Sequence, residues 1–248
     1  MDEENHLDRS SSWARPVSRL ATADLPAGAV NLNVAGRQVV GPLQGFGQLW
    51  QKTYQVRLSG ANIAPVQVIR VWKENFPDFW PQGNKFYAPL TGIKPGEVAV
   101  LNLAGPGGLS GPGGVPVIST GVLVIYADDE SFSFMTPQGH MFAAIITFSA
   151  YDDEGTVAQV QALIRANDPL YELTFRLGFG HRMEDEFWRQ TLVNLAAHFS
   201  VRGQVQQKVT LVDTRVQWSR AKNIWHNAAI RTAFYMPVAL AHRIFKGR

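Results

Sequence analysis

The side chains that most often carry chemistry, namely cysteine, histidine and the carboxylates, form few patterns in this chain of 248 residues. Cysteine is absent, which excludes disulfides, thiol catalysis and cysteine-ligated metals. The six histidines are scattered and lack the H-E-x-x-H spacing of zinc enzymes. We therefore expect a protein that holds neither a metal nor a cofactor.

His140 is the residue that we single out as a candidate for acid–base catalysis. It follows the turn at 137–139 and opens an apolar strand, so at the rim of a cavity it could act as a general base. An ordinary hydrogen bond at the strand end is the alternative. The acidic residues offer it no partner, because those at 128–130 and 152–154 fall in turns. Those at 184–186 fall in the first turn of a helix, where they favour the helix dipole.

The segment 104–116 holds six glycines and three prolines. It lacks both phosphate-binding patterns, G-x-G-x-x-G and G-x-x-x-x-G-K-[ST], and it leads into a strand instead of opening a helix. We expect a lid over a cavity or a plain surface loop, not a nucleotide site.

Aromatic residues are the informative class, with seven Trp, fourteen Phe and six Tyr. Ten apolar side chains from predicted helices and strands could line one internal cavity, and ordinary core packing is the competing interpretation of each. These ten residues are Trp72, Phe76, Phe79, Phe132, Phe134, Met135, Phe142, Phe148, Phe187 and Trp188.

These side chains must be positioned by a mixed set of elements. Alternation of apolar and polar residues predicts strands at 30–34 and 50–58, with Lys52 as the only break in the second pattern. Pro65 begins a helix with an aromatic face that breaks at Pro77. Further strands are predicted where short apolar runs are separated by turns, at 98–103, 117–126, 131–136, 140–151 and 156–166. Tight turns between the last four strands indicate an antiparallel sheet.

Helices return after the sheet. Asp168 and Pro169 begin one with Leu170, Leu173 and Leu177 along its apolar face, and a second begins near Arg182 and continues to about residue 199. A possible strand at 209–218 and a helical stretch at 222–245 follow. Within the strand at 140–151, the segment 142–148 is apolar on both faces, so we expect the C-terminal extension to cover it with Trp218, Ile224, Trp225 and Phe234.

This order of strand, aromatic helix, loop, four-stranded meander and long helix resembles the START-like, helix-grip superfamily (SRPBCC), which includes polyketide cyclases and lipid-transfer proteins. The resemblance covers roughly residues 48–200 and rests on Trp72 and Phe76 of the first helix and on the closing helix at 184–199. It implies an α+β fold whose antiparallel sheet curves around the long helix and encloses an apolar cavity. The long loop at 104–116 and the nearly fifty residues after the closing helix depart from it, so no ligand is carried over.

Three regions follow from this pattern: a flexible arm at 1–27, a helix-grip domain at 28–203 and a basic extension at 204–248. Residues 200–248 hold nine Lys and Arg against one acid, a net charge of +8. The extension could contact an anionic membrane or pack on the domain, whereas nucleic acid is disfavoured because the basic residues are interleaved with apolar ones. The polar start is not a signal peptide, which indicates the cytoplasm, with peripheral membrane contact as an option.

The function that we expect is non-covalent binding of a hydrophobic small molecule or lipid in the cavity. A polyketide cyclase- or hydrolase-like enzyme using the same cavity is one alternative, and an interaction protein with a filled core is another. Binding requires an open cavity of roughly 300 Å³ or more. An enzyme also needs a polar pair inside it, such as His140 with an acid or Tyr, and a structural role needs neither.

Overall fold

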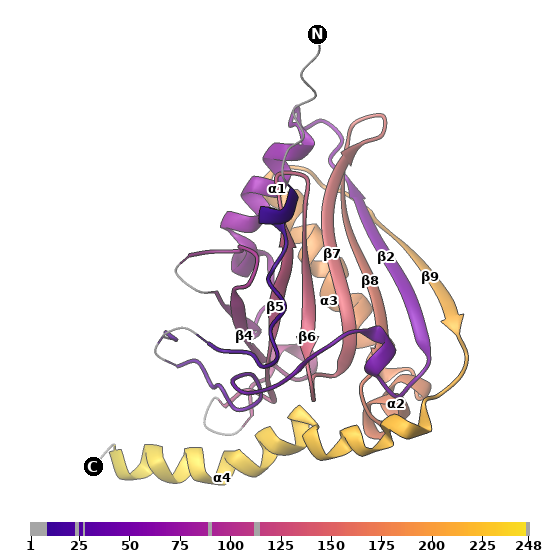
Figure 1. The fold of residues 1–248 in the computed structure, drawn as a ribbon. Helices are drawn as coiled ribbons and strands as arrows, with labels where there is room; N and C mark the ends of the chain where they lie inside the picture. The colour runs from indigo at the N-terminus through magenta and orange to yellow at the C-terminus, as the bar shows by residue number, and fades with distance from the viewer. Residues whose placement is uncertain (1–8, 23–24, 27, 89–90, 112–114, 247–248) are drawn as a thin grey trace.

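The computed structural model describes residues 9–22, 25–26, 28–88, 91–111 and 115–246, and the side chains of 239–240 and 242–246 lie outside this description. Within this part, one nine-stranded sheet runs in the order β3-β4-β5-β6-β7-β8-β2-β9, and β1 pairs with β6 (Figure 1). Every pairing is antiparallel. The strands are β1 (Val39–Val40), β2 (Leu49–Arg57), β3 (Lys85–Tyr87), β4 (Val98–Leu103), β5 (Ile118–Ala127), β6 (Ser131–Pro137), β7 (Phe142–Asp152), β8 (Thr156–Ala166) and β9 (Val205–Asp213).

The helical elements lie between and after the strands. They are η1 (Arg9–Ser12), η2 (Pro42–Gln44), α1 (Pro65–Glu74), η3 (Phe76–Phe79), η4 (Pro106–Gly108), α2 (Pro169–Arg176), α3 (Phe179–His198), η6 (Trp218–His226) and α4 (Ala228–Lys246). No helix in the described ranges is long and apolar enough to cross a membrane.

The helix-grip prediction is confirmed. α1 and α3 both lie against one face of the sheet (Figure 1), with Trp72 of α1 and Leu192 of α3 fully buried there. Small side chains on the facing strands, among them Ala144, Ala158 and Ala162, let the helices approach the sheet closely. The meander of β4 to β8 and the break between α1 and η3 also follow the sequence pattern.

The strand expected at 30–34 is wrong, because these residues form an irregular segment. Their alternation reflects burial in a loop: Val34 packs in a small apolar cluster with Val100 of β4, and the Asn33 side chain is buried. The Asn33 amide donates to Ser119 O over 2.8 Å and accepts from Arg231 Nε over 2.9 Å. Side-chain hydrogen bonds therefore take the place of a strand ladder here.

The described part of the N-terminal arm is attached to the sheet, unlike the flexible lead-in that its polar composition predicts. Trp13 forms a bridge with Tyr126 at the end of β5. Leu20 is buried, and its backbone exchanges 2.8 Å hydrogen bonds with Arg37 O and Gly36 N. Ala14 N also donates to Ile125 O and Arg19 Nη1 to Gly36 O, so several contacts hold this polar segment in place.

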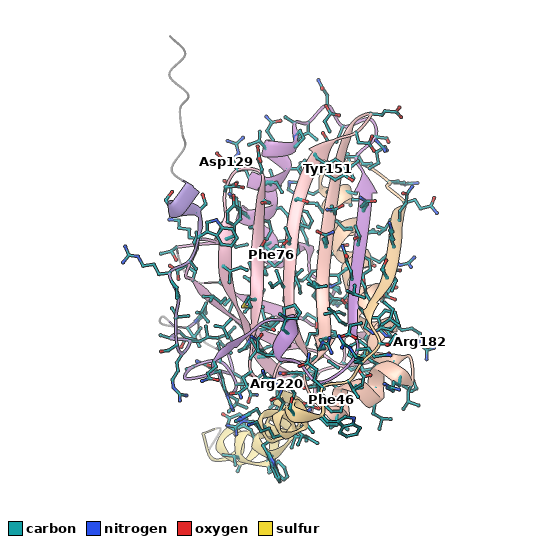
Figure 2. The ribbon with its side chains drawn as sticks, turned by 45° about the vertical axis from the view of Figure 1, so that its right-hand side comes forward. Phe46, Phe76, Asp129, Tyr151, Arg182 and Arg220 are labelled. Carbon is teal, nitrogen blue, oxygen red and sulfur yellow. The ribbon has the colours of Figure 1, made fainter. Side chains whose placement is uncertain are left out.

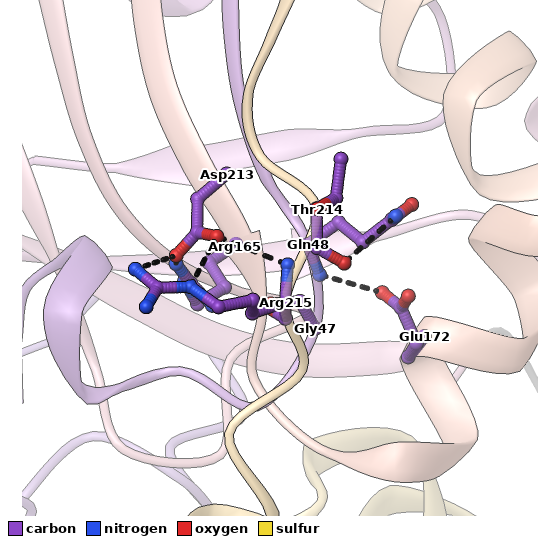
Figure 3. A network of polar contacts seen from close by, with 7 residues as sticks. All are labelled: Gly47, Gln48, Arg165, Glu172, Asp213, Thr214 and Arg215. Carbon is purple, nitrogen blue, oxygen red and sulfur yellow. Dashed lines mark hydrogen bonds and ion pairs between the residues drawn. The ribbon is translucent and has the colours of Figure 1, made fainter.

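The C-terminal segment joins the same sheet. Its strand β9 lies earlier than the expected 209–218 and pairs with β2. Arg165 of β8 secures the end of β9: its Nη2 donates to Asp213 Oδ2 over 3.0 Å, and its Nη1 donates to Gly47 O over 2.6 Å (Figure 3). The same network holds α2, because Gln48 N donates to Glu172 Oε2.

α4 runs along one end of the sheet (Figure 1), where Thr232 Oγ1 accepts from Ser119 N of β5 over 3.0 Å. The expectation that the C-terminal aromatics cover β7 is wrong, since Trp218, Trp225 and Phe234 are exposed. The segment after η2 covers β7 instead, where Gly45 lies close to the side chain of Ala143. In the loop 104–116, Gly111 lies next to Met236 of α4, and residues 112–114 are outside the described part.

Candidate functional site

The space between α3 and the sheet holds nine of the ten predicted cavity residues. The exception is Met135, which alternates with Phe134 along β6 and therefore points to the opposite face, near Gly41. Phe76 lies near the centre of the molecule (Figure 2). The other members of this aromatic interior are Trp72, Phe79, Phe132, Phe134, Phe142, Phe148, Phe187 and Trp188.

These rings pack against one another. The Phe148 ring centroid lies 4.6 Å from that of Phe132, 5.1 Å from Phe76 and 5.5 Å from Trp188. A hollow of about 90 Å³ lies elsewhere, on the polar outer face of the sheet beside Tyr151 (Figure 2). In this conformation the side chains themselves therefore occupy the space in which a ligand was expected.

A charged cluster interrupts the apolar surroundings where β2 faces α3. The Lys52 side chain is 1% exposed, and its Nζ lies 2.7 Å from Glu184 Oε2 and 2.6 Å from Asp185 Oδ1. Tyr54, two residues further along β2, donates its hydroxyl to the same Asp185 oxygen over 2.7 Å. We call these four residues the buried cluster.

Burial and the Lys52 charge act on the pKa values of the buried cluster in different ways. Burial raises the pKa of Glu184 to about 7, against the attraction of the Lys52 ammonium. Burial also raises the pKa of Asp185, but hydrogen bonds from Lys52 and Tyr54 outweigh it, and the net pKa is lowered. Burial and the neighbouring carboxylates raise the pKa of the Tyr54 hydroxyl. At neutral pH, Glu184 is thus the member of the cluster closest to exchanging a proton.

Several buried polar atoms in this interior have no hydrogen-bond partner among the described residues. They include Glu184 Oε1, His181 Nδ1 and the indole nitrogens of Trp72 and Trp80. Burial, followed by the Lys52 charge, lowers the pKa of His181 to about 4, so its ring is neutral at pH 7. Buried polar groups are normally paired, so unpaired ones mark this interior as a candidate binding site.

The sequence carried one signal for this cluster. Lys52 stood on the apolar face of β2, where an unpaired charge is costly, so a buried acidic partner was required. The partner was missed because the helix was expected to begin near Arg182. α3 begins at Phe179, which moves 184–186 out of the first turn and turns Glu184 and Asp185 towards β2.

The structure places His140 away from this cluster, in the turn before β7. Its ring is buried, and Nδ1 accepts a 3.0 Å hydrogen bond from Phe142 N. Burial lowers the pKa of His140 to about 4. The described residues contain no group of three or more His, Asp or Glu side chains arranged to hold a metal ion.

A second candidate site lies on the surface, at the end of the sheet where α2 and the C-terminal segment meet (Figure 1). Trp218, Trp225 and Phe234 are 74%, 80% and 79% exposed. The structure also corrects the predicted apolar face of α2, which buries Tyr171 and Phe175 and leaves its leucines outside. We call this surface the aromatic end; its apolar members are Leu170, Leu173, Leu177, Phe179, Trp218, Trp225 and Phe234, all exposed.

Basic side chains accompany the aromatic end. Arg215, Lys222 and Arg231 lie on the C-terminal segment, and the Arg182 guanidinium lies 5.2 Å from the centroid of the Phe179 ring. Arg182 and Arg220 flank this end of the molecule (Figure 2). One cation, Arg182, thus lies against an apolar member of the aromatic end, while Arg215 is paired with Asp213 and Arg231 donates to Asn33.

Neither a protein-family model nor a curated protein matches this chain. Among solved structures, protein Ms6760 from Mycobacterium smegmatis is 15% identical, with a TM-score of 0.39 over 66% of this chain and 96% of its own. An uncharacterised protein from Rhizobium leguminosarum is 15% identical, with a TM-score of 0.38 over 62% and 95%. Major latex-like protein 151 from Panax ginseng is 12% identical, with a TM-score of 0.36 over 62% and 99%.

Proposed function

We propose that this protein docks on anionic membrane surfaces through its aromatic end. The observation that carries the proposal is the exposure of Trp218, Trp225 and Phe234 on a segment whose net charge is +8. Tryptophan is enriched at membrane interfaces, and exposed apolar groups among cations favour anionic lipid headgroups.

The fold supports this proposal by holding both parts of the aromatic end in place. The Trp218 ring lies 5.4 Å from Phe46, and Gln217 N donates to Phe46 O over 2.7 Å, so the start of η6 is fixed to the sheet. Tyr171 of α2 accepts from Ala229 N over 3.1 Å, which fixes α2 to the start of α4. The exposed leucines of α2 and the aromatics of the C-terminal segment are therefore held at the same end. An exposed apolar surface of this extent is typical of an interaction site.

Vesicle sedimentation of the full chain tests the proposal. We expect binding to vesicles of phosphatidylcholine mixed with phosphatidylglycerol, weaker binding to phosphatidylcholine alone, and loss of binding at high salt. The double variant W218A/W225A should bind at least about tenfold more weakly, because each indole contributes apolar area to the membrane contact. Equal binding to both vesicle types, or binding that the double variant retains, contradicts the proposal.

Trp13 offers a matched control. It is also an exposed tryptophan, at 57%, but it lies beside Tyr126 near the other end of the sheet. Trp13→Ala should therefore leave vesicle binding unchanged. A loss equal to that of the double variant would mean that tryptophan content matters and the aromatic end does not.

We infer, as a second function, that the interior between α3 and the sheet takes up a hydrophobic small molecule. The unpaired indole nitrogens of Trp72 and Trp80 support it, since two buried donors stand ready among apolar rings. A ligand must displace rings such as Phe148, which are now in contact. Native mass spectrometry of the purified chain, followed by organic extraction, tests this function. A bound lipid or other hydrophobic compound supports it, and an empty protein that also fails to take up added aromatic compounds contradicts it.

A further inference from the structure

Both carboxylate oxygens of Glu184 in the buried cluster lack a hydrogen bond from the described residues, and only Oε2 has an ion-pair contact, with Lys52 Nζ. Lys52 Nζ contacts Glu184 Oε2 and Asp185 Oδ1, and the Tyr54 hydroxyl also donates to Asp185 Oδ1. Glu184 Oε1 has no partner among the described residues, although the side chain is only 3% exposed. A buried carboxylate oxygen without a donor is costly, so Oε1 would gain from a hydrogen bond donated by a bound molecule.

The surroundings of Glu184 are aromatic on both sides along α3. One turn before it lies His181, whose ring centroid is 4.9 Å from Trp50 and 4.7 Å from Phe175. One turn after it lies Trp188, which packs on Phe148. An apolar molecule that reaches Glu184 therefore meets rings at each end.

The burial of the cluster selects the kind of donor. Glu184 lies in a buried site, where a second cation would have to give up its hydration, and that loss is costly. A neutral hydroxyl or amide N–H carries a much smaller cost of burial. The Asp185 side chain is 26% exposed, so the cluster reaches solvent on one side.

We propose that Glu184 Oε1 is the binding site for the hydroxyl or amide N–H of a neutral aromatic molecule. The apolar part of that molecule lies among Trp50, Phe175 and Trp188, while Lys52 and Asp185 act as positioning residues for the Glu184 carboxylate. This inference rests on the second function proposed above, uptake of a small molecule by the interior.

Two matched probes test the site, because they differ in one hydrogen-bond donor. We would titrate the full chain with 2-naphthol and with 2-methoxynaphthalene by calorimetry at pH 8, above the Glu184 pKa of about 7, so that the carboxylate is mostly ionised. A hydrogen bond to a charged group predicts that 2-naphthol binds about tenfold or more tightly than the ether. Glu184→Gln should reduce this ratio to a few-fold at most, because a neutral amide oxygen replaces the charged acceptor.

Glu172 supplies the control, since it is another buried carboxylate but both of its oxygens have partners, Arg176 Nε and Gln48 N. Glu172→Gln should keep the preference for 2-naphthol. If the Glu184→Gln variant does not fold, Glu184→Leu removes the acceptor with a side chain that introduces no polar atom, and the same loss of preference is expected.

The failures are distinguishable. Equal binding of the two probes, or a preference that survives in both Glu184 variants, overturns the Glu184 site and leaves uptake of hydrophobic molecules in place. Binding of neither probe overturns both the site and the uptake of aromatic molecules on which it rests.

Discussion

Asn227 Nδ2 donates a 2.8 Å hydrogen bond to Oδ2 of Asp168, so one carboxylate joins two helices that are distant in sequence. The other oxygen of Asp168 caps α2 by accepting from Leu170 N and Tyr171 N. Asn227 in turn accepts from Ile230 N in the first turn of α4. The relative placement of α2 and α4, and with it the aromatic end, depends on this pair.

Replacing Asn227 by alanine should therefore lower stability. The variant loses the cap of α4 and leaves Asp168 Oδ2 buried without its donor, and we expect a loss of about 2–4 kcal/mol in the free energy of unfolding. Urea denaturation measures it. Gln206→Ala, in an exposed position of β9, is the control and should change stability by less than about 0.5 kcal/mol. A loss no greater than that of the control would show that the pair is dispensable.

Glu184 should make the stability of the protein depend on pH. Its pKa is about 7 in the folded state against an ordinary value of 4.5, so the folded state binds the proton more tightly than the unfolded one. The contribution of this group is therefore fully favourable below about pH 4.5 and is lost as the pH rises through about 7, by at most about 3 kcal/mol.

Denaturation at pH 5 and pH 8 measures this dependence, and comparison with Glu184→Gln isolates it from the other ionisable groups. Asp185 acts in a different window, because its lowered pKa costs stability only when the pH falls below its ordinary value of 3.8. The wild-type chain should lose more stability than the variant between the two pH values. Equal losses would mean that Glu184 titrates normally.

Replacement by alanine should lower the free energy of unfolding much more at Leu192 than at Leu173. Leu192 of α3 is fully buried, and Leu192→Ala should cost about 2–5 kcal/mol in unfolding free energy. Leu173 of α2 is 52% exposed, so Leu173→Ala should cost less than about 1 kcal/mol while weakening vesicle binding. A large loss of stability in the Leu173 variant would return that residue to the core, where the sequence pattern first placed it.

Gly47 occupies a position where a side chain does not fit. A Cβ there would lie 2.0 Å from Glu172 Oε2 and 2.8 Å from the Ala166 Cβ. Gly47→Ala should therefore displace α2 and cost about 1–3 kcal/mol. Gly105→Ala, where the nearest atom would be 3.4 Å away, is the matched control and should be close to neutral in thermal denaturation.

The sequence predicted those parts of the fold that local signals determine. The strands β4 to β8 were found within two residues at nearly every end, because turns such as 128–130 separate runs of apolar residues. α1 was recognised from Pro65 and from the spacing of its buried side chains. These signals are short in range and need no knowledge of the partner elements.

The parts that failed depend on partners distant in the sequence. α2 has apolar residues on two faces, and its docking against α3, β8 and η6 decides that Tyr171 is buried and Leu173 is not. Predicting the buried cluster would have needed two pieces of information. One is that α3 begins at Phe179, and the other is that Lys52 pairs with Glu184 and Asp185, which lie 132 and 133 positions later in the chain. The position of β9 was predicted a few residues too late, because its bounds depend on pairing with β2, its strand partner within the described ranges, about 150 residues earlier in the chain.

The alanines on β7 and β8 set how near α3 lies to the sheet, while rings such as Phe76 and Phe148 fill what remains. The volume open to a bound molecule in the interior is therefore determined by the size of these side chains, while the backbone of α3 and the sheet encloses the space around them. Exchanging one or two of these rings for small residues would enlarge the space open to a bound molecule, at a stability cost of about 3–5 kcal/mol for each ring. The backbone arrangement and the side chains that fill the interior can be varied separately in this molecule, which makes it a suitable starting scaffold for designed binding proteins.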